Sequence, residues 1–135
     1  MAIQLSATVR NARLDAIEST VGASAILEIR SGAAPADCAT ADSGTLLASM
    51  TLPADWMAAA SAGSKAKSGT WQDASANAAG TAGHFRIKDS GGTTCHLQGT
   101  ITATGGGGDM ELDNTSIASG QQITITTFTL TDGNA

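Results

Sequence analysis

Hydrophobic positions near the N-terminus recur every three or four residues, which is the spacing of one face of an α-helix. The sequence therefore predicts a helix over 5–21, with Ser6 as its N-terminal cap and Gly22 where a left-handed residue commonly ends a helix. The expected apolar stripe and its flanks are Leu5, Val9, Ala12, Leu14, Ala16, Ile17, Thr20 and Val21. The expected solvent side carries Asn11, Arg13, Asp15 and Glu18. Such a helix either covers a sheet or serves as an arm that docks on another subunit.

After Gly22 the period of the pattern changes to two, which is the spacing of a strand with one buried face. The segments predicted as strands are 25–30, 45–52, 65–73, 84–88, 93–104, a short strand from Met110 with its exit near Ile117, and 123–130. Pro53 ends the second strand, Asp89–Gly92 predicts a tight hairpin, and Gly105–Gly108 predicts a flexible turn.

Strands that follow one another without intervening helices indicate antiparallel pairing. A sheet of this size must bury one face, and two packed sheets satisfy that need. The predicted fold is all-β, an antiparallel β-sandwich of jelly-roll type with one N-terminal α-helix. We expect a helical arm over 1–22 and the sandwich over 23–135, together forming a single domain.

The composition is dominated by small side chains: 26 Ala, 16 Gly and 31 Ser plus Thr among 135 residues, with a net charge of −5. The seven Lys and Arg residues are scattered, whereas binding to nucleic-acid phosphates needs them clustered. No apolar run approaches the ~18 residues of a membrane span, and the N-terminus lacks the pattern of a secretory signal. We expect no direct nucleic-acid partner, no membrane span and folding in the cytoplasm.

Two pairs of residues are candidates for metal or redox chemistry. His84 and His96 would face each other if the hairpin turn centres on Ser90, and two such imidazoles could hold a transition metal. A shift of one residue in the register removes this pairing, so ordinary polar strand residues are the favoured interpretation. Cys38 and Cys95 are expected to be reduced in the cytoplasm, and a disulfide formed after release into an oxidising medium is the alternative.

Asp109, Glu111 and Asp113 alternate and would project from one face of a strand, where they could bind Ca²⁺. An extended strand spaces such carboxylates ~6.6 Å apart, so a solvated sheet edge is the favoured interpretation. The sequence contains no catalytic triad signature, paired-carboxylate motif or nucleotide fingerprint. We therefore expect no catalytic residues, no metal, no cofactor and no enzymatic activity.

Small side chains lose little conformational entropy when another subunit covers them, which favours a structural subunit. The four aromatic residues Trp56, Trp71, Phe85 and Phe128 are needed for the core, which disfavours an exposed carbohydrate-binding platform.

Several short segments carry a resemblance that runs nearly from end to end of the chain. They are Met1-Ala-Ile-Gln-Leu-Ser6, Val9-Arg-Asn-Ala-Arg-Leu-Asp-Ala-Ile-Glu18, Leu52-Pro-Ala-Asp-Trp56, Ser68-Gly-Thr-Trp71, Ala82-Gly-His-Phe-Arg86, Gly107-Gly-Asp-Met110 and Phe128-Thr-Leu-Thr131. With these segments the chain resembles small virion proteins of tailed bacteriophages and their prophages. None of the segments is a catalytic signature.

The resemblance implies a virion protein, specifically a cement (decoration) subunit of jelly-roll type on the outside of the capsid shell. Its partners would be the major capsid protein and copies of itself. A neck, collar or tail component is one alternative, and a virion module that binds a glycan or receptor is another. The helix and the segment 53–73 are expected to supply the contacts, and the two lysines of that segment could meet an acidic partner. The expected contact residues are Leu5, Val9, Arg13, Trp56, Met57, Lys65 and Lys67.

Overall fold

The computed structural model describes residues 3–133, so the outermost two residues of the predicted arm and of the predicted sandwich lie outside the described residues. The described chain is mostly β-strand with one helix, α1 (Ala7–Val21), which confirms the all-β class. The strands are β1 (Ile26–Ser31), β2 (Leu46–Thr51), β3 (Ser64–Ala66), β4 (Trp71–Asp73), β5 (Gly80–Lys88), β6 (Cys95–Ala103), β7 (Met110–Leu112), β8 (Ser116–Ile117), β9 (Ile123–Ile125) and β10 (Thr129–Thr131). Within this range no helix is both long and apolar enough to cross a membrane.

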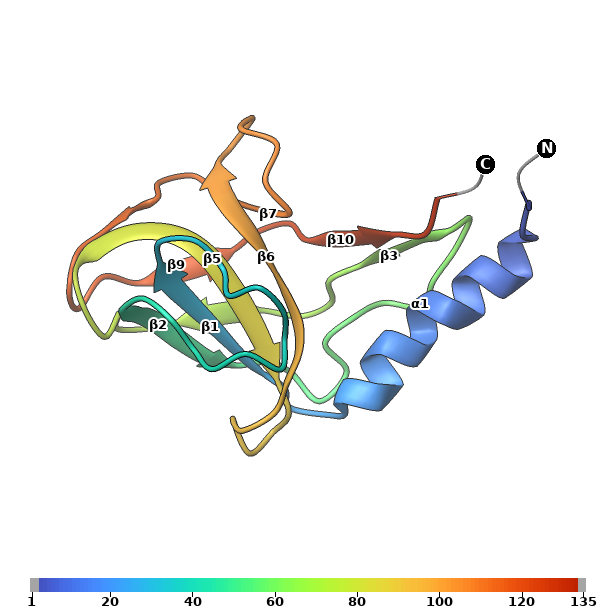
Figure 1. Ribbon diagram of the computed structural model, residues 1–135, viewed down its shortest axis with the longest axis horizontal. Coiled ribbons are helices and arrows are strands. Elements are labelled where there is room, and N and C mark those ends of the chain that lie inside the picture. Colours follow the sequence, from blue (N-terminus) through green and yellow to red (C-terminus); the bar gives the residue numbers. More distant parts are fainter. Residues whose placement is uncertain (1–2, 134–135) are drawn as a thin grey trace.

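A curled sheet with the strand order β2-β1-β5-β6-β7 forms the body of the molecule (Figure 1). Neighbouring strands from β2 to β6 are antiparallel, and β8 pairs with the beginning of β5. β5 lies in the middle of the sheet, and its last five residues, from His84 to Lys88, are all buried. Both faces of the sheet are therefore covered along this strand.

The pairing of β6 with β7 is parallel, which differs from the predicted antiparallel arrangement. Residues 104–109 carry the chain back so that β7 runs in the same direction as β6. Gly105 and Gly107 adopt positive φ angles of 86° and 81°, and their amides donate to the Glu111 carboxylate at 2.9 and 3.2 Å. The predicted flexible turn is thus an ordered loop, because the Glu111 carboxylate accepts hydrogen bonds from two of its backbone amides.

Two of the predicted strands are each divided into two short ones. The segment 65–73 contains most of β3 and all of β4, and the segment 123–130 contains β9 and most of β10. β3 pairs with β10, whereas β4 pairs with β9. Gly69 has a φ of 72° between β3 and β4, and Phe128 enters the core between β9 and β10. The alternation of apolar and polar residues in the sequence continues across the breaks between β3 and β4 and between β9 and β10, so the sequence pattern does not reveal these breaks.

The four aromatic rings form a continuous buried chain across the core. The ring centroids are 6.0 Å apart for Trp56 and Trp71, 5.6 Å for Trp71 and Phe128, and 5.5 Å for Phe85 and Phe128. The rings come from the loop after β2, from β4, from the segment before β10 and from β5, and all four are buried. Apolar side chains of the main sheet pack around them: Leu27, Ile29, Leu47, Met50, Ile87, Ile101 and Met110. This cluster joins the sheet to the shorter strand pairs.

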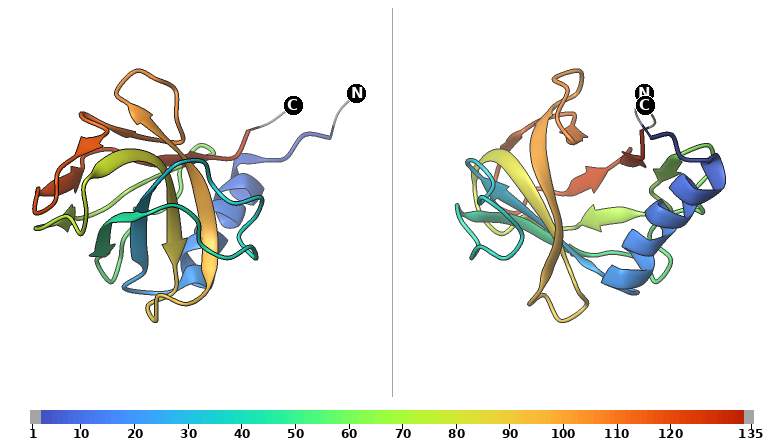
Figure 2. Two further views of the ribbon diagram at one scale, coloured as in Figure 1. Left: turned by 60° about the vertical axis from the view of Figure 1, so that its left-hand side comes forward. Right: turned by 45° about the vertical axis from the view of Figure 1, so that its right-hand side comes forward.

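The predicted helix is confirmed, including both of its caps. The Val9 amide donates to Ser6 Oγ at 3.2 Å, and the Gly22 amide donates to the Glu18 carbonyl at 2.9 Å with Gly22 at a φ of 93°. In Figure 2 the helix lies at one end of the molecule, beside the β3–β10 pair and away from the centre of the main sheet. Its position makes the helix an outer element of the fold.

A close backbone approach provides a test of the fold. A Cβ atom added to Gly83 on β5 would clash with the backbone carbonyl of Gly32, whereas one added to Gly91 in the hairpin turn would make only ordinary contacts at 3.6 and 3.7 Å. We predict that Gly83→Ala lowers the free energy of unfolding by about 1–3 kcal/mol, because the backbone must shift. Gly91→Ala should change it by less than about 0.5 kcal/mol. Urea denaturation followed by tryptophan fluorescence measures both, and equal stabilities for the two variants would contradict this packing.

Candidate docking surface on the helix

Helix α1 is attached to the rest of the protein through its polar side. Three of its side chains accept hydrogen bonds from backbone amides in the segment that precedes β3. Asn11 Oδ1 accepts from Gly63 at 2.9 Å, Asp15 Oδ1 from Ala60 at 3.0 Å, and Glu18 Oε1 from Met57 at 3.1 Å. These bonds satisfy amides that the short strands leave unpaired, and they fix the helix along its length.

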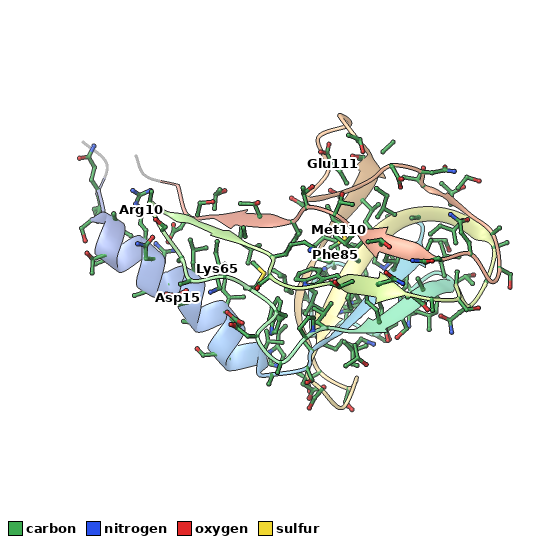
Figure 3. The ribbon with its side chains drawn as sticks, turned by 180° about the vertical axis from the view of Figure 1, so that it is seen from behind. Arg10, Asp15, Lys65, Phe85, Met110 and Glu111 are labelled. Atoms are coloured by element: carbon green, nitrogen blue, oxygen red, sulfur yellow. The ribbon has the colours of Figure 1, made fainter. Side chains whose placement is uncertain are left out.

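Lys65 on β3 forms the centre of this attachment (Figure 3). Its side chain is 2% exposed, and its Nζ lies 2.7 Å from Asp15 Oδ1, 2.9 Å from Glu18 Oε2 and 2.9 Å from the Ala58 carbonyl. Burial alone would lower the pKa of Lys65, but the hydrogen bonds to Asp15 and Glu18 outweigh it and raise the pKa. The ammonium group therefore stays charged and holds two turns of the helix.

The first half of the helix is also tied to the C-terminal strand. Arg10 Nη1 donates to the Asp132 carbonyl at 3.1 Å, and Arg13 Nε lies 3.2 Å from the Asp132 carboxylate. Arg13 is otherwise exposed, so this ion pair adds little to stability. Its effect is to place the end of β10 beside α1.

The side of α1 that faces away from these contacts is lined by small and apolar residues. Val9 is 45% exposed, and Ala12, Ala16 and Thr20 are exposed as well. We call these four residues the helix stripe. Beside the stripe, a shallow hollow lies between α1 and β6 and is lined by Arg13, Ala16, Ile17, Thr20, Val21 and His96. Ile3, just before the helix, is 85% exposed.

The orientation of the helix differs in part from the predicted one. The helix stripe, which is expected to be buried, faces outward, while Asn11, Asp15 and Glu18 of the expected solvent side make the contacts. Leu14 and Val21 of the expected apolar side are buried as predicted, and Arg13 of the expected solvent side is exposed. The reason is electrostatic: the buried ammonium of Lys65 requires carboxylates, and only the polar side of the helix supplies them.

The residues expected to contact a partner fall into two groups. Trp56, Met57 and Lys65 are buried, and they hold α1 instead of facing a partner; for example, Trp56 Nε1 donates to the Gly22 carbonyl at 3.0 Å. Lys67 lies 5.8 Å above the Trp71 ring and donates to the Gly69 carbonyl at 2.7 Å. The charge of Lys65 is therefore not free for an acidic partner, whereas Lys67 is half-buried and pairs with no carboxylate among the described residues.

The remaining three expected contact residues belong to α1 or directly precede it. Val9 and Arg13 are exposed, and Leu5 is half-buried. The structure thus brings Val9 and Arg13 together on the outer surface of the helix, at the beginning of the stripe.

A second set of charged residues was not predicted as a group. Glu28 and Arg30 of β1 and Arg86 and Lys88 of β5 share one face of the main sheet, where Asp42 from the loop after β1 covers them. Asp42 lies 2.6 Å from both Arg86 and Lys88, and Glu28 lies 2.9 Å from Arg30 and 3.0 Å from Lys88. The alternation of charged residues in β1 and β5 indicates that one face of the sheet is polar. It does not predict that a loop covers this face.

The two histidines do not face each other. The hairpin turn is centred between Gly91 and Gly92 and not on Ser90, and a bulge at the end of β5 shifts the register by one further residue, so that His84 lies opposite Thr100. His84 is buried and its Nδ1 lies 2.9 Å from the Gly32 carbonyl, whereas His96 lines the hollow beside α1. This arrangement contradicts the geometry that a two-histidine metal site requires.

The three alternating acidic residues have different roles. Asp109 Oδ2 accepts hydrogen bonds from the Thr100 amide at 2.9 Å and the Thr100 hydroxyl at 3.0 Å, and Glu111 binds the glycine-loop amides described above. Asp113 is exposed. Asp109 and Glu111 therefore organise the loop beside them, and the group lies along β7, an edge strand of the main sheet, with Asp109 and Asp113 exposed as predicted.

Comparison of the chain with protein-family models, with curated proteins and with solved structures finds no match in any of the three.

The role of Lys65 can be tested by substitution. We predict that Lys65→Met lowers the free energy of unfolding by about 2 kcal/mol, because Asp15 and Glu18 lose their charged partner. Lys67→Met removes the same charge two residues away and should cost less than about 1 kcal/mol. Denaturation curves provide the measurement. A cost for Lys67→Met equal to that for Lys65→Met would contradict the proposed attachment.

The covered charge cluster predicts a loss of stability in acid. Burial would raise the pKa of Asp42, but hydrogen bonds from Lys88 and Arg86 outweigh it and lower the pKa below its usual value. A carboxylate with a lowered pKa stabilises the folded state above its ordinary pKa of about 3.9, and this contribution is lost as the pH falls through the lowered value. We therefore predict that the free energy of unfolding falls as the pH is lowered below about 4.

The matched variants for this pH dependence are Asp42→Asn and Asp113→Asn. Asp42→Asn should lower stability at pH 7 and reduce the slope in acid, whereas Asp113→Asn, at an exposed position, should keep the wild-type slope. Urea denaturation across the pH range measures both effects. An unchanged acid slope in Asp42→Asn would show that this cluster is not the cause.

Proposed function

We propose that this chain is a structural virion protein of a tailed bacteriophage, a cement (decoration) subunit that stabilises the head shell by binding across capsid subunits. The observation that carries the proposal is the helix stripe: α1 is fixed by its polar side and presents Val9, Ala12 and Ala16 outward. A rigid helix with an outward apolar stripe is suited to bind a flat protein surface. The major capsid protein and further copies of this chain are the proposed partners.

The charges of the protein support the same proposal. Each of the seven Lys and Arg side chains makes a contact within the chain, through carboxylates, carbonyls or the Trp71 ring. The surface that remains consists largely of Ala, Ser, Thr and Gly. Such side chains have few rotamers to lose, so that close packing against neighbouring subunits has a low entropic cost.

The mechanism that follows is mass action. A subunit that binds the assembled shell but not its separated parts stabilises the shell by the difference in binding free energy. Each contact can be weak, because many identical contacts act together. The sandwich of jelly-roll type that the resemblance implies is part of this proposal.

The aromatic residues bear on the alternative of a glycan-binding module. Stacking on a sugar ring needs an exposed aromatic side chain, yet Trp56, Trp71, Phe85 and Phe128 are all in the core. This arrangement favours the structural role. A neck, collar or tail component would bind through the same kind of surface, and its copy number in the particle would differ from that of a cement subunit.

The test uses particles assembled in cells that carry the phage or prophage genome encoding this chain. The double variant Val9→Glu, Ala16→Glu places two charges on the helix stripe, and we predict that its amount relative to the major shell protein falls at least ~10-fold in purified particles, because the charges lose their hydration at the contact. Thr8→Glu is the control: it adds one such charge to an exposed position on a different side of the same helix. Quantitative mass spectrometry of the particles measures the ratio.

The outcomes separate the parts of the proposal. Circular dichroism and thermal melting of both purified variants should match the wild type, since the stripe makes none of the contacts that hold α1. Wild-type levels of the double variant in particles would overturn the docking surface. Absence of the wild-type chain from particles would overturn the virion role, and a copy number far below that of the shell protein would favour the neck or tail position.

A further inference from the structure

The loop between β1 and β2 is held flat against the polar face of the main sheet. Arg86 on β5 donates to three of its carbonyls: Thr40 at 3.0 Å, Cys38 at 2.9 Å and Asp37 at 3.3 Å. Gln98 on β6 donates to the Pro35 carbonyl at 2.8 Å. These bonds place residues 35–40 directly over β5 and β6.

Cys38 lies in the middle of this loop, and Cys95 lies at the beginning of β6. Cys95 is opposite Lys88, whose side chain lies under the same loop, bound to Asp42 at 2.6 Å. Cys95 therefore lies on the sheet face that this loop covers, and the Cys38 carbonyl is bound to Arg86 on the same face. Both are free thiols and only partly buried, so a small oxidant can reach them.

We propose that Cys38 and Cys95 are a disulfide-forming pair, which closes by exchange with a low-molecular-weight disulfide such as oxidised glutathione and fastens the loop after β1 to β6. The proposal does not depend on the function of the protein, because it rests on the position of the loop alone. The folded chain brings the two residues to the same part of the sheet face although 57 positions separate them in the sequence.

The exchange proceeds in two steps. The Cys95 thiolate attacks one sulfur of oxidised glutathione, which forms a mixed disulfide and releases one glutathione thiolate. Cys38 then loses its proton to solvent and attacks the Cys95 sulfur, which forms the Cys38–Cys95 bond and releases the second glutathione thiolate. Overall, two protein thiols are oxidised and one glutathione disulfide is reduced to two thiols.

The surroundings of Cys38 determine the pH dependence of the second step. Burial, together with the neighbouring Cys95 thiol, raises the pKa of Cys38 to about 11. Cys38 is therefore protonated at neutral pH, and closure should accelerate as the pH rises. The Arg86 guanidinium acts in the opposite direction, because its positive charge lowers the pKa of Cys38 and so favours the Cys38 thiolate.

The experiment uses the reduced full-length chain, incubated with oxidised glutathione at pH 8 and digested with trypsin without reduction. Cleavage after Arg30, Lys65 and Lys88 places the cysteines in separate peptides, 31–65 and 89–135. We expect these two peptides to be joined, both free thiols of a monomeric chain to be lost, and Tm to rise on the order of 10 °C, because the bond closes a long loop. A reducing agent should reverse the change.

The single variants Cys38→Ser and Cys95→Ser are the controls. After the same treatment, both variants should keep the Tm of the reduced wild type. The cysteine that remains in each variant should be either a free thiol or a mixed disulfide with glutathione. The proposal is overturned if the wild type stops at the mixed disulfide, joins two chains to each other, keeps both thiols, or closes the bond without a rise in Tm.

Discussion

The buried ammonium group of Lys65 determines how the outer part of this protein is built. A charge removed from water must be paired, and here the partners are Asp15 and Glu18 of α1, at 2.7 and 2.9 Å. Because the carboxylates must point inward, the opposite side of the helix must point outward. The exposed Val9, Ala12 and Ala16 are thus a consequence of the charge on β3, and the proposed docking surface depends on it.

The same principle operates on the far side of the main sheet. Arg86 and Lys88 are buried, and the loop after β1 supplies Asp42 and several carbonyls to them. The chain therefore uses its few charges to fasten a helix at one end and a loop over one face, around a core centred on four aromatic rings. What remains for contact with other molecules is a surface rich in small side chains that also carries exposed carboxylates such as Asp55 and Asp113, and this surface suits the proposed subunit that acts by binding.

The sequence predicts some of these features and not others, for physical reasons. Ser6, Gly22 and the change of period after Gly22 locate α1 and β1, since caps and periodicity are local signals. The orientation of α1 was not predictable from its apolar positions, because Asn11, Asp15 and Glu18 also recur at helical spacing and either side could face inward. The division of 65–73 into β3 and β4 depends on which strand each part pairs with, β10 or β9, and this is decided far away in the sequence. The covering of Arg86 likewise depends on a loop about 45 residues earlier in the chain.

The most direct test of the account is a cryo-electron microscopy map of the intact particle that shows this chain next to its neighbours. The account predicts that the outward side of α1, from Val9 to Ala16, is covered by another subunit while Lys65 stays paired with Asp15 and Glu18. A map in which α1 faces solvent in every copy, with the contacts made by another part of the chain, would contradict it.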